Sequence, residues 1–190
     1  MINLRIFDKI SILIASTLLL LGCDQDTSSS ILMEESKTKR PNILLILTDD
    51  LGYTDIGAFG GEIRTPNLNA LAGDGLLLTN FYSAPTCSPT RAMLLSGTDY
   101  HLAGLGTMNG NWDTNQMGQR GYEAYLNNDV VSVSSLLQDS GYHTYMAGKW
   151  HLGNTPEFHP PKRGFDKSFY LLQGGASHFG DRASLFSTWT

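Results

Sequence analysis

The feature that most limits the possible fold is a continuous apolar run, Asn42–Thr48 (NILLILT), which leads directly into two aspartates. Runs of this kind, bounded by turn-like residues, are typical of strands that are buried on both faces, as in a parallel sheet. Patterns of helices and strands alternate along the rest of the chain, which favours the same architecture. The sequence therefore predicts an α/β fold, a sandwich with a largely parallel central sheet.

The other expected elements follow from turn residues and hydrophobic spacing. Three helices are expected: residues 65–75 with Thr65 as N-cap, residues 89–97 with Pro89 in the first turn, and a segment from Val130 to a stop at Gly141. Further strands are expected over residues 76–83 and 143–148, and in the last part of residues 155–175. Residues 103–121 have the composition of a loop.

Length and charge exclude some classes of protein. The 190 residues fit one domain. The formal net charge is −5, with 13 basic and 18 acidic side chains. Nucleic-acid binding is disfavoured, because it normally requires clustered Lys and Arg.

The first residues resemble a targeting segment. Two basic residues precede a short apolar stretch that ends in Leu-Leu-Gly-Cys at Cys23, as in the lipobox of bacterial lipoproteins. We expect residues 1–23 to be a lipoprotein-type signal peptide, residues 24–40 a flexible polar tether, and residues 41–190 the domain. Lipidated Cys23 would anchor an exported protein at the periplasmic face of a membrane or at the cell surface. An ordinary signal peptide is the alternative.

Asp49 and Asp50 follow the predicted strand Asn42–Thr48, at the kind of strand end where α/β proteins place their sites. Taken alone, such a pair is more often a turn or a helix cap. As a site, two adjacent carboxylates supply hard oxygen ligands for Ca²⁺ or Mg²⁺, although they do not complete a coordination sphere.

Lys149 and His151 follow the predicted strand 143–148 and can reach the same pocket. A lysine there neutralises an anion, and a histidine transfers protons near neutral pH. A structural role is the usual explanation for a single histidine beside a tryptophan.

Cys87 is the second of two cysteines and starts the motif CSPTRAMLLSG. Ser88 and Pro89 place a helix N-terminus directly after it, where free N–H groups and the helix dipole favour anions. The guanidinium of Arg91, in the first turn, can point to the same place. A small buried thiol or a cysteine nucleophile partnered by histidine are the alternatives.

Together these segments resemble the sulfatase family. The motif at Cys87 resembles the sulfatase signature Cys-x-Pro-x-Arg, and residues 42–57 resemble the family's first strand with its acidic pair. The segment GYHTYMAGKWHLG resembles its second signature, and RGFDKSFYLLQGGASHFG resembles the continuation seen in arylsulfatases. The resemblance covers residues 41–180 and implies the N-terminal part of a formylglycine-dependent sulfatase domain of the alkaline phosphatase superfamily.

The resemblance implies a sulfuric ester hydrolase of arylsulfatase type. A formylglycine-generating or anaerobic sulfatase-maturating enzyme would convert Cys87 to formylglycine, whose hydrate attacks the sulfur of a sulfate monoester. Asp49, Asp50 and the converted Cys87 would bind one divalent ion, usually Ca²⁺. Arg91 would orient the hydrate, Lys149 would bridge it to the sulfate, and His151 would take the proton that releases sulfate.

The family's second pair of metal ligands and a further His and Lys find no match before Thr190. We therefore expect the chain, an incomplete record or a natural truncation, to be inactive on its own. Phosphonate or phosphate ester hydrolysis within the same superfamily is one alternative, and a non-catalytic lipoprotein that binds sulfated glycans is another. Comparing the rates at which matched aryl sulfate and aryl phosphonate esters are hydrolysed would distinguish a sulfatase from a phosphonate or phosphate ester hydrolase.

Overall fold

The computed structural model describes residues 40–176 and 185–187. The chain divides into two units, with the boundary between Ile46 and Leu47. The predicted signal peptide with Cys23, and the predicted tether up to residue 39, lie outside the described residues. Among the helices that are described, none is both long and apolar enough to cross a membrane.

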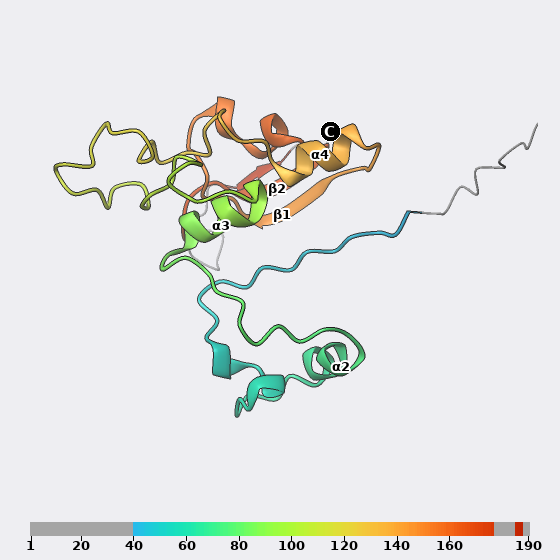
Figure 1. Cartoon of the computed structure of the whole chain (residues 1–190). Helices are drawn as coiled ribbons and strands as arrows, with labels where there is room; N and C mark the ends of the chain where they lie inside the picture. Colours follow the sequence, from blue (N-terminus) through green and yellow to red (C-terminus); the bar gives the residue numbers. More distant parts are fainter. Residues whose placement is uncertain (1–39, 177–184, 188–190) are drawn as a thin grey trace, which may run out of the picture. The chain divides into compact units, whose positions relative to one another are not determined.

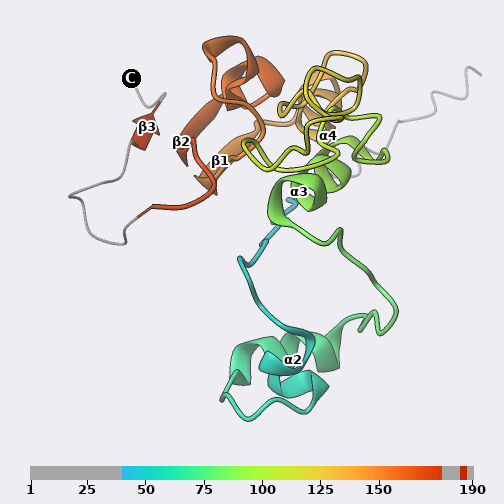
Figure 2. The same ribbon diagram turned by 90° about the vertical axis from the view of Figure 1, so that its left-hand side faces the viewer.

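The sheet belongs to the second unit and has the strand order β1–β2–β3 (Figures 1 and 2). Strand β1 (Tyr145–Lys149) pairs in parallel with β2 (Lys167–Leu171), in a register that runs from Tyr145 opposite Lys167 to Lys149 opposite Leu171. Strand β3 (Leu185–Ser187) pairs with β2 in antiparallel orientation. The α/β class is confirmed, and the predicted strand at 143–148 begins and ends slightly later than expected.

The three helices begin and end close to the residues that their caps predicted. Helix α2 (Pro66–Asp74) follows Thr65 and ends at Gly75, and α3 (Cys87–Ser96) ends at Gly97 with a φ of +64°. Helix α4 (Val133–Asp139) starts later than the apolar spacing suggested, because the side chain of Ser132 accepts a hydrogen bond from Ser135 N and caps it. Over the described part of the chain there are also four short 3₁₀-helices: η1 (Tyr53–Asp55), η2 (Gly57–Phe59), η3 (Pro156–Phe158) and η4 (Pro160–Arg163).

Two predicted strands are wrong. Neither residues 42–48 nor residues 76–83 form a strand, and the side chains of Leu44 and Leu76 are 85% and 83% exposed. An apolar run indicates that a segment favours burial, but only hydrogen bonding to a neighbouring strand makes it a strand. The described sheet consists of β1, β2 and β3 alone.

The core lies where the chain leaves β1. Trp150 is 1% exposed and Leu152 is fully buried, and both pack with Tyr170 of β2 and Ala92 of α3. The remaining buried members of this cluster come from the loops and from the residue that follows β2: Ala103, Leu105, Leu126 and Leu172. Packing of Trp150 and Leu152 fixes the segment that carries Lys149 and His151.

Candidate active site

The carboxyl end of β1 presents two of the predicted residues, on either side of a buried tryptophan. The backbone N–H of Trp150 donates to Leu171 O (2.8 Å), and its indole N–H donates to Phe158 O (2.9 Å). Lys149 and His151 flank this anchored residue. His151 adopts a φ of +59°, a left-handed conformation that disfavours a residue with a side chain by roughly 1–2 kcal/mol. The surrounding contacts therefore hold His151 in place.

Helix α3 presents Cys87 as its first residue. Thr86 precedes it in extended conformation, and the hydroxyl of Thr90 donates to Thr86 O (2.9 Å) and Ala84 O (3.1 Å). The helix is ten residues long, so the dipole and the free N–H groups of its first turn lie beside Cys87. This is the anion-favouring position that the sequence predicted.

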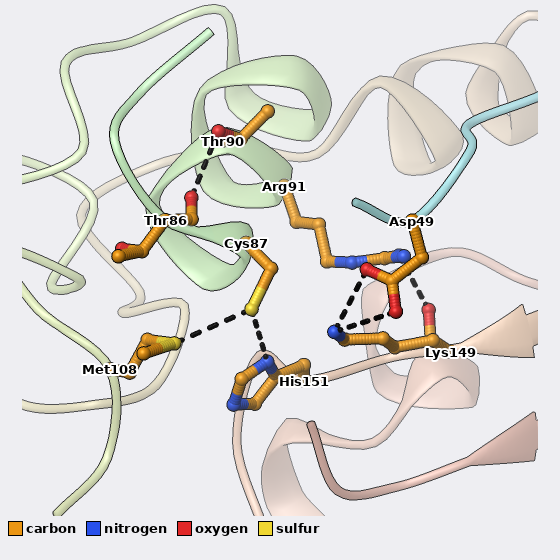
Figure 3. Close-up of polar contacts among 8 residues, drawn as sticks. All are labelled: Asp49, Thr86, Cys87, Thr90, Arg91, Met108, Lys149 and His151. Carbon is orange, nitrogen blue, oxygen red and sulfur yellow. Dashed lines mark hydrogen bonds and ion pairs between the residues drawn. The ribbon is translucent and has the colours of Figure 1, made fainter. Parts of the chain in front are cut away.

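The sulfur of Cys87 lies between two side chains that are distant in sequence (Figure 3). Its Sγ is 3.3 Å from Nδ1 of His151 and 3.4 Å from Sδ of Met108. Cys87 is partly buried and free of disulfide bonding. The thiol therefore contacts two side chains: the imidazole of His151, which can form a hydrogen bond with it, and the thioether of Met108.

Arg91 joins helix α3 to the end of β1. Its Nη1 donates to the backbone carbonyl of Lys149 at 2.6 Å (Figure 3). Burial lowers the pKa of the Arg91 guanidinium from its usual value, while Asp49 and Cys87 oppose that shift. The guanidinium remains a cation and adds positive charge to the site near Cys87.

The ammonium of Lys149 pairs with Asp49, with Nζ at 3.1 Å from Oδ1 and 3.3 Å from Oδ2. The Lys149 side chain is only 11% exposed, whereas that of Asp49 is 52% exposed. Asp50 has a φ of +50°, which aspartate tolerates better than most residues. Both aspartates, Cys87 and Arg91 line one cavity of about 650 Å³.

His151 is neutral at pH 7. Burial lowers the pKa of its imidazole to about 4, and the positive charges of Lys149 and Arg91 act in the same direction, with Asp49 opposing them. A neutral ring has one nitrogen that donates and one that accepts. His151 can therefore give a hydrogen bond to the group at position 87 or take one from it.

The carboxylates of Asp49 and Asp50 are hard oxygen donors, the chemistry that Ca²⁺ prefers. Ca²⁺ takes six to eight oxygen ligands, however, and Asp49 is already paired with Lys149. Over residues 40–176 and 185–187, no three His, Cys, Asp or Glu side chains are grouped so that they could hold a metal ion. The described residues do not by themselves fit a calcium site.

Five of the six residues predicted for the domain's site contact one another in two groups: Cys87 with His151, and Lys149 with Arg91 and Asp49. Asp50 lines the same cavity. Sequence reasoning missed Met108, which it left in a loop without a role. Nothing in the local pattern around Met108 distinguishes it, because its contact with Cys87 arises only when that loop folds back.

Comparison with known proteins adds an independent finding. The family model described as Sulfatase matches residues 41–189. An uncharacterised sulfatase of Schizosaccharomyces pombe is 52% identical over 153 residues, covering 77% of this chain and 27% of that protein. An arylsulfatase of Klebsiella aerogenes is 44% identical over 150 residues, covering 79% and 32% respectively.

A solved structure is also similar. The crystal structure of Ps i-CgsB is 40% identical, with a TM-score of 0.63, and the match covers 74% of this chain and 30% of that one. In each comparison the match spans about a third of the relative or less.

Proposed function

Because the chain belongs to the sulfatase family, we propose that its site serves the hydrolysis of sulfate monoesters. The observation that carries this proposal is the position of Cys87, at the start of α3 and in contact with His151 beside the cations Arg91 and Lys149. A sulfate ester is an anion, and further negative charge builds up on the leaving-group oxygen as its bond to sulfur breaks. Cations and helix N–H groups stabilise that charge.

Residue 87 supplies the nucleophile in this proposal. A separate sulfatase-maturating enzyme, which supplies the oxidising equivalents and removes the sulfur, would convert the thiol to formylglycine. The hydrate of this aldehyde provides an oxygen nucleophile and a second hydroxyl, whose deprotonation re-forms the aldehyde and expels sulfate. The Cβ of Cys87 becomes the aldehyde carbon, so Sγ marks where the reactive oxygens would be attached. His151, 3.3 Å from this position, is the candidate for holding and moving the proton.

The lowered pKa of His151 is consistent with a cationic site that binds an anionic substrate. In the free protein, burial and the charges of Lys149 and Arg91 keep the ring neutral. A bound sulfate ester would bring negative charge next to those cations and thereby oppose their effect on His151. Its imidazole would then hold a proton more readily when substrate is present than when the site is empty.

The proposal includes a divalent ion, with Ca²⁺ expected, beside Asp49 and Asp50. Because these two carboxylates are an incomplete set, we expect the 190-residue chain to bind Ca²⁺ no more tightly than about 1 mM, the weak end of protein calcium sites. Lys149→Gln should bind Ca²⁺ several-fold more tightly, because it frees Asp49. Isothermal titration calorimetry of both proteins, with Asp49→Asn as control, checks this. Micromolar binding by the unsubstituted chain would contradict it.

Conversion of Cys87 is the most direct test of the proposed function. We expect protein from its native host, or chain coexpressed with a formylglycine-generating enzyme, to carry an aldehyde at position 87. Peptide mass spectrometry across residues 84–91 and labelling with a hydrazide reagent measure it. The Cys87→Ala variant should give no label. Finding only unmodified thiol in protein from the native host would exclude the formylglycine mechanism.

A further inference from the structure

Gly174 lies directly against the imidazole of His151. A Cβ built on Gly174 would overlap Cε1 of that ring and would lie 2.7 Å from Nε2 and 2.9 Å from Nδ1. Contacts below 3.0 Å are essentially never seen for a real Cβ. Any side chain at position 174 therefore requires the imidazole to move.

The imidazole has little freedom to move without losing its contact with Cys87. The backbone N–H of His151 donates to Leu172 O (3.1 Å), two residues before Gly174. Its left-handed φ fixes the direction in which the side chain leaves the backbone, and its Nδ1 lies 3.3 Å from Cys87 Sγ. The segment after β2 thus holds His151 twice, by its backbone at Leu172 and by its ring at Gly174.

We propose that Gly174 is a positioning residue that directs the His151 imidazole at the side chain of residue 87. It does so because a hydrogen is the only substituent that leaves room for the ring. This inference deepens the proposed function, since it rests on His151 acting on residue 87.

The neighbouring Gly175 is a matched control. Neither glycine adopts a φ in the left-handed region, so alanine suits the backbone at both positions. A Cβ on Gly175 would have nothing within 4 Å. Gly174→Ala and Gly175→Ala therefore make the same chemical change and differ in whether the added methyl group meets His151.

The experiment uses the full chain with Cys87 left as a thiol and Cys23→Ser, so that Cys87 is the single thiol. Alkylation of Cys87 by iodoacetamide at pH 7 is measured for this parent, Gly174→Ala, His151→Ala, the double variant and Gly175→Ala. Because the His151 ring is neutral, its N–H can donate to the sulfur, and a hydrogen bond to the sulfur favours the reactive thiolate. Displacing the ring should therefore slow alkylation.

We expect Gly174→Ala and His151→Ala each to slow alkylation by at least about threefold. An effect of this size lies within the range of interaction energies measured between contacting residues. The double variant should react like His151→Ala alone, and Gly175→Ala like the parent. A purely structural effect of Gly174→Ala would instead persist in the His151→Ala background, and that result would overturn the proposal. So would equal effects of the two glycine substitutions.

A measurement without substitutions at the site covers the case in which Gly174→Ala does not fold. In the parent chain, the Hα protons of Gly174 should show a nuclear Overhauser effect to Hε1 of His151, because the two groups are in van der Waals contact. Absence of this effect in the folded protein would overturn the proposal. Neither measurement requires the aldehyde, so this inference and the proposed function can fail separately.

Discussion

Replacing Trp150 with alanine is expected to lower the free energy of unfolding by about 3–5 kcal/mol, the range for large aromatic side chains removed from a core. Trp150 is 1% exposed, and its ring packs edge-on against Phe165 with a centroid distance of 6.2 Å. Its indole N–H is bonded to Phe158 O, so the substitution also leaves that carbonyl without its donor. Domains are stable by only about 5–15 kcal/mol, and a large part of that margin would be lost.

Trp112 provides the comparison. Its indole N–H also donates to a backbone carbonyl, Tyr122 O at 2.9 Å, but the residue is only half-buried. Trp112→Ala should cost about 1–2 kcal/mol, mainly the hydrogen bond and part of the packing. Urea unfolding followed by far-ultraviolet circular dichroism measures both. Losses of equal size would show that the segment after β1 is not the core of this domain.

Replacing Gly164 with alanine should destabilise the protein nearly as much, by about 2–5 kcal/mol. Gly164 has a φ of +82°, and a Cβ there would overlap the backbone N of Ser135 and lie 2.5 Å from its Cα. The left-handed backbone accounts for roughly 1–2 kcal/mol, and forcing apart the packed backbone for about 1–3 kcal/mol more. This close approach lies at the contact between η4 and the first turn of α4. At the same contact, the hydroxyl of Ser132 donates to Arg163 O (2.7 Å).

Gly97 separates the two contributions. It has a φ of +64° at the end of α3, and a Cβ there would have nothing within 4 Å. Gly97→Ala should therefore show only the backbone term, about 1–2 kcal/mol. The difference between the two urea midpoints, converted with a common m-value, isolates the steric contact with Ser135. If Gly164→Ala lost no more stability than Gly97→Ala, the close packing of η4 on α4 would be refuted.

Helices were predicted better than strands, and the reason is physical. The ends of α2 and α3 are set by local chemistry, with a proline in the first turn and a glycine after the last one. A strand is defined by its partner. The segments 42–48 and 76–83 have the composition of strands yet are not paired in the described sheet. Sequence pattern alone cannot supply that partner.

The candidate site was largely predicted, because its residues belong to short motifs. Cys87 and Arg91 are on one helical turn, and Lys149 and His151 are separated by a single residue, so each pair could be found locally. Their roles stay predictions until the chemistry at position 87 is measured. Met108 and Gly174 could not be found in the same way, since each matters only through a contact made across the fold.

By itself, the sequence determined the family, the α/β class, the ends of α2 and α3 within about two residues, and the residue types that gather around Cys87. Only the tertiary structure decided which groups contact each other. It brings Lys149 onto Asp49 across 100 residues, and it places His151 between Gly174 and Cys87. The physical reason is that backbone preferences and caps act within a few residues. Burial and side-chain geometry, by contrast, depend on whichever segments the packed core brings together.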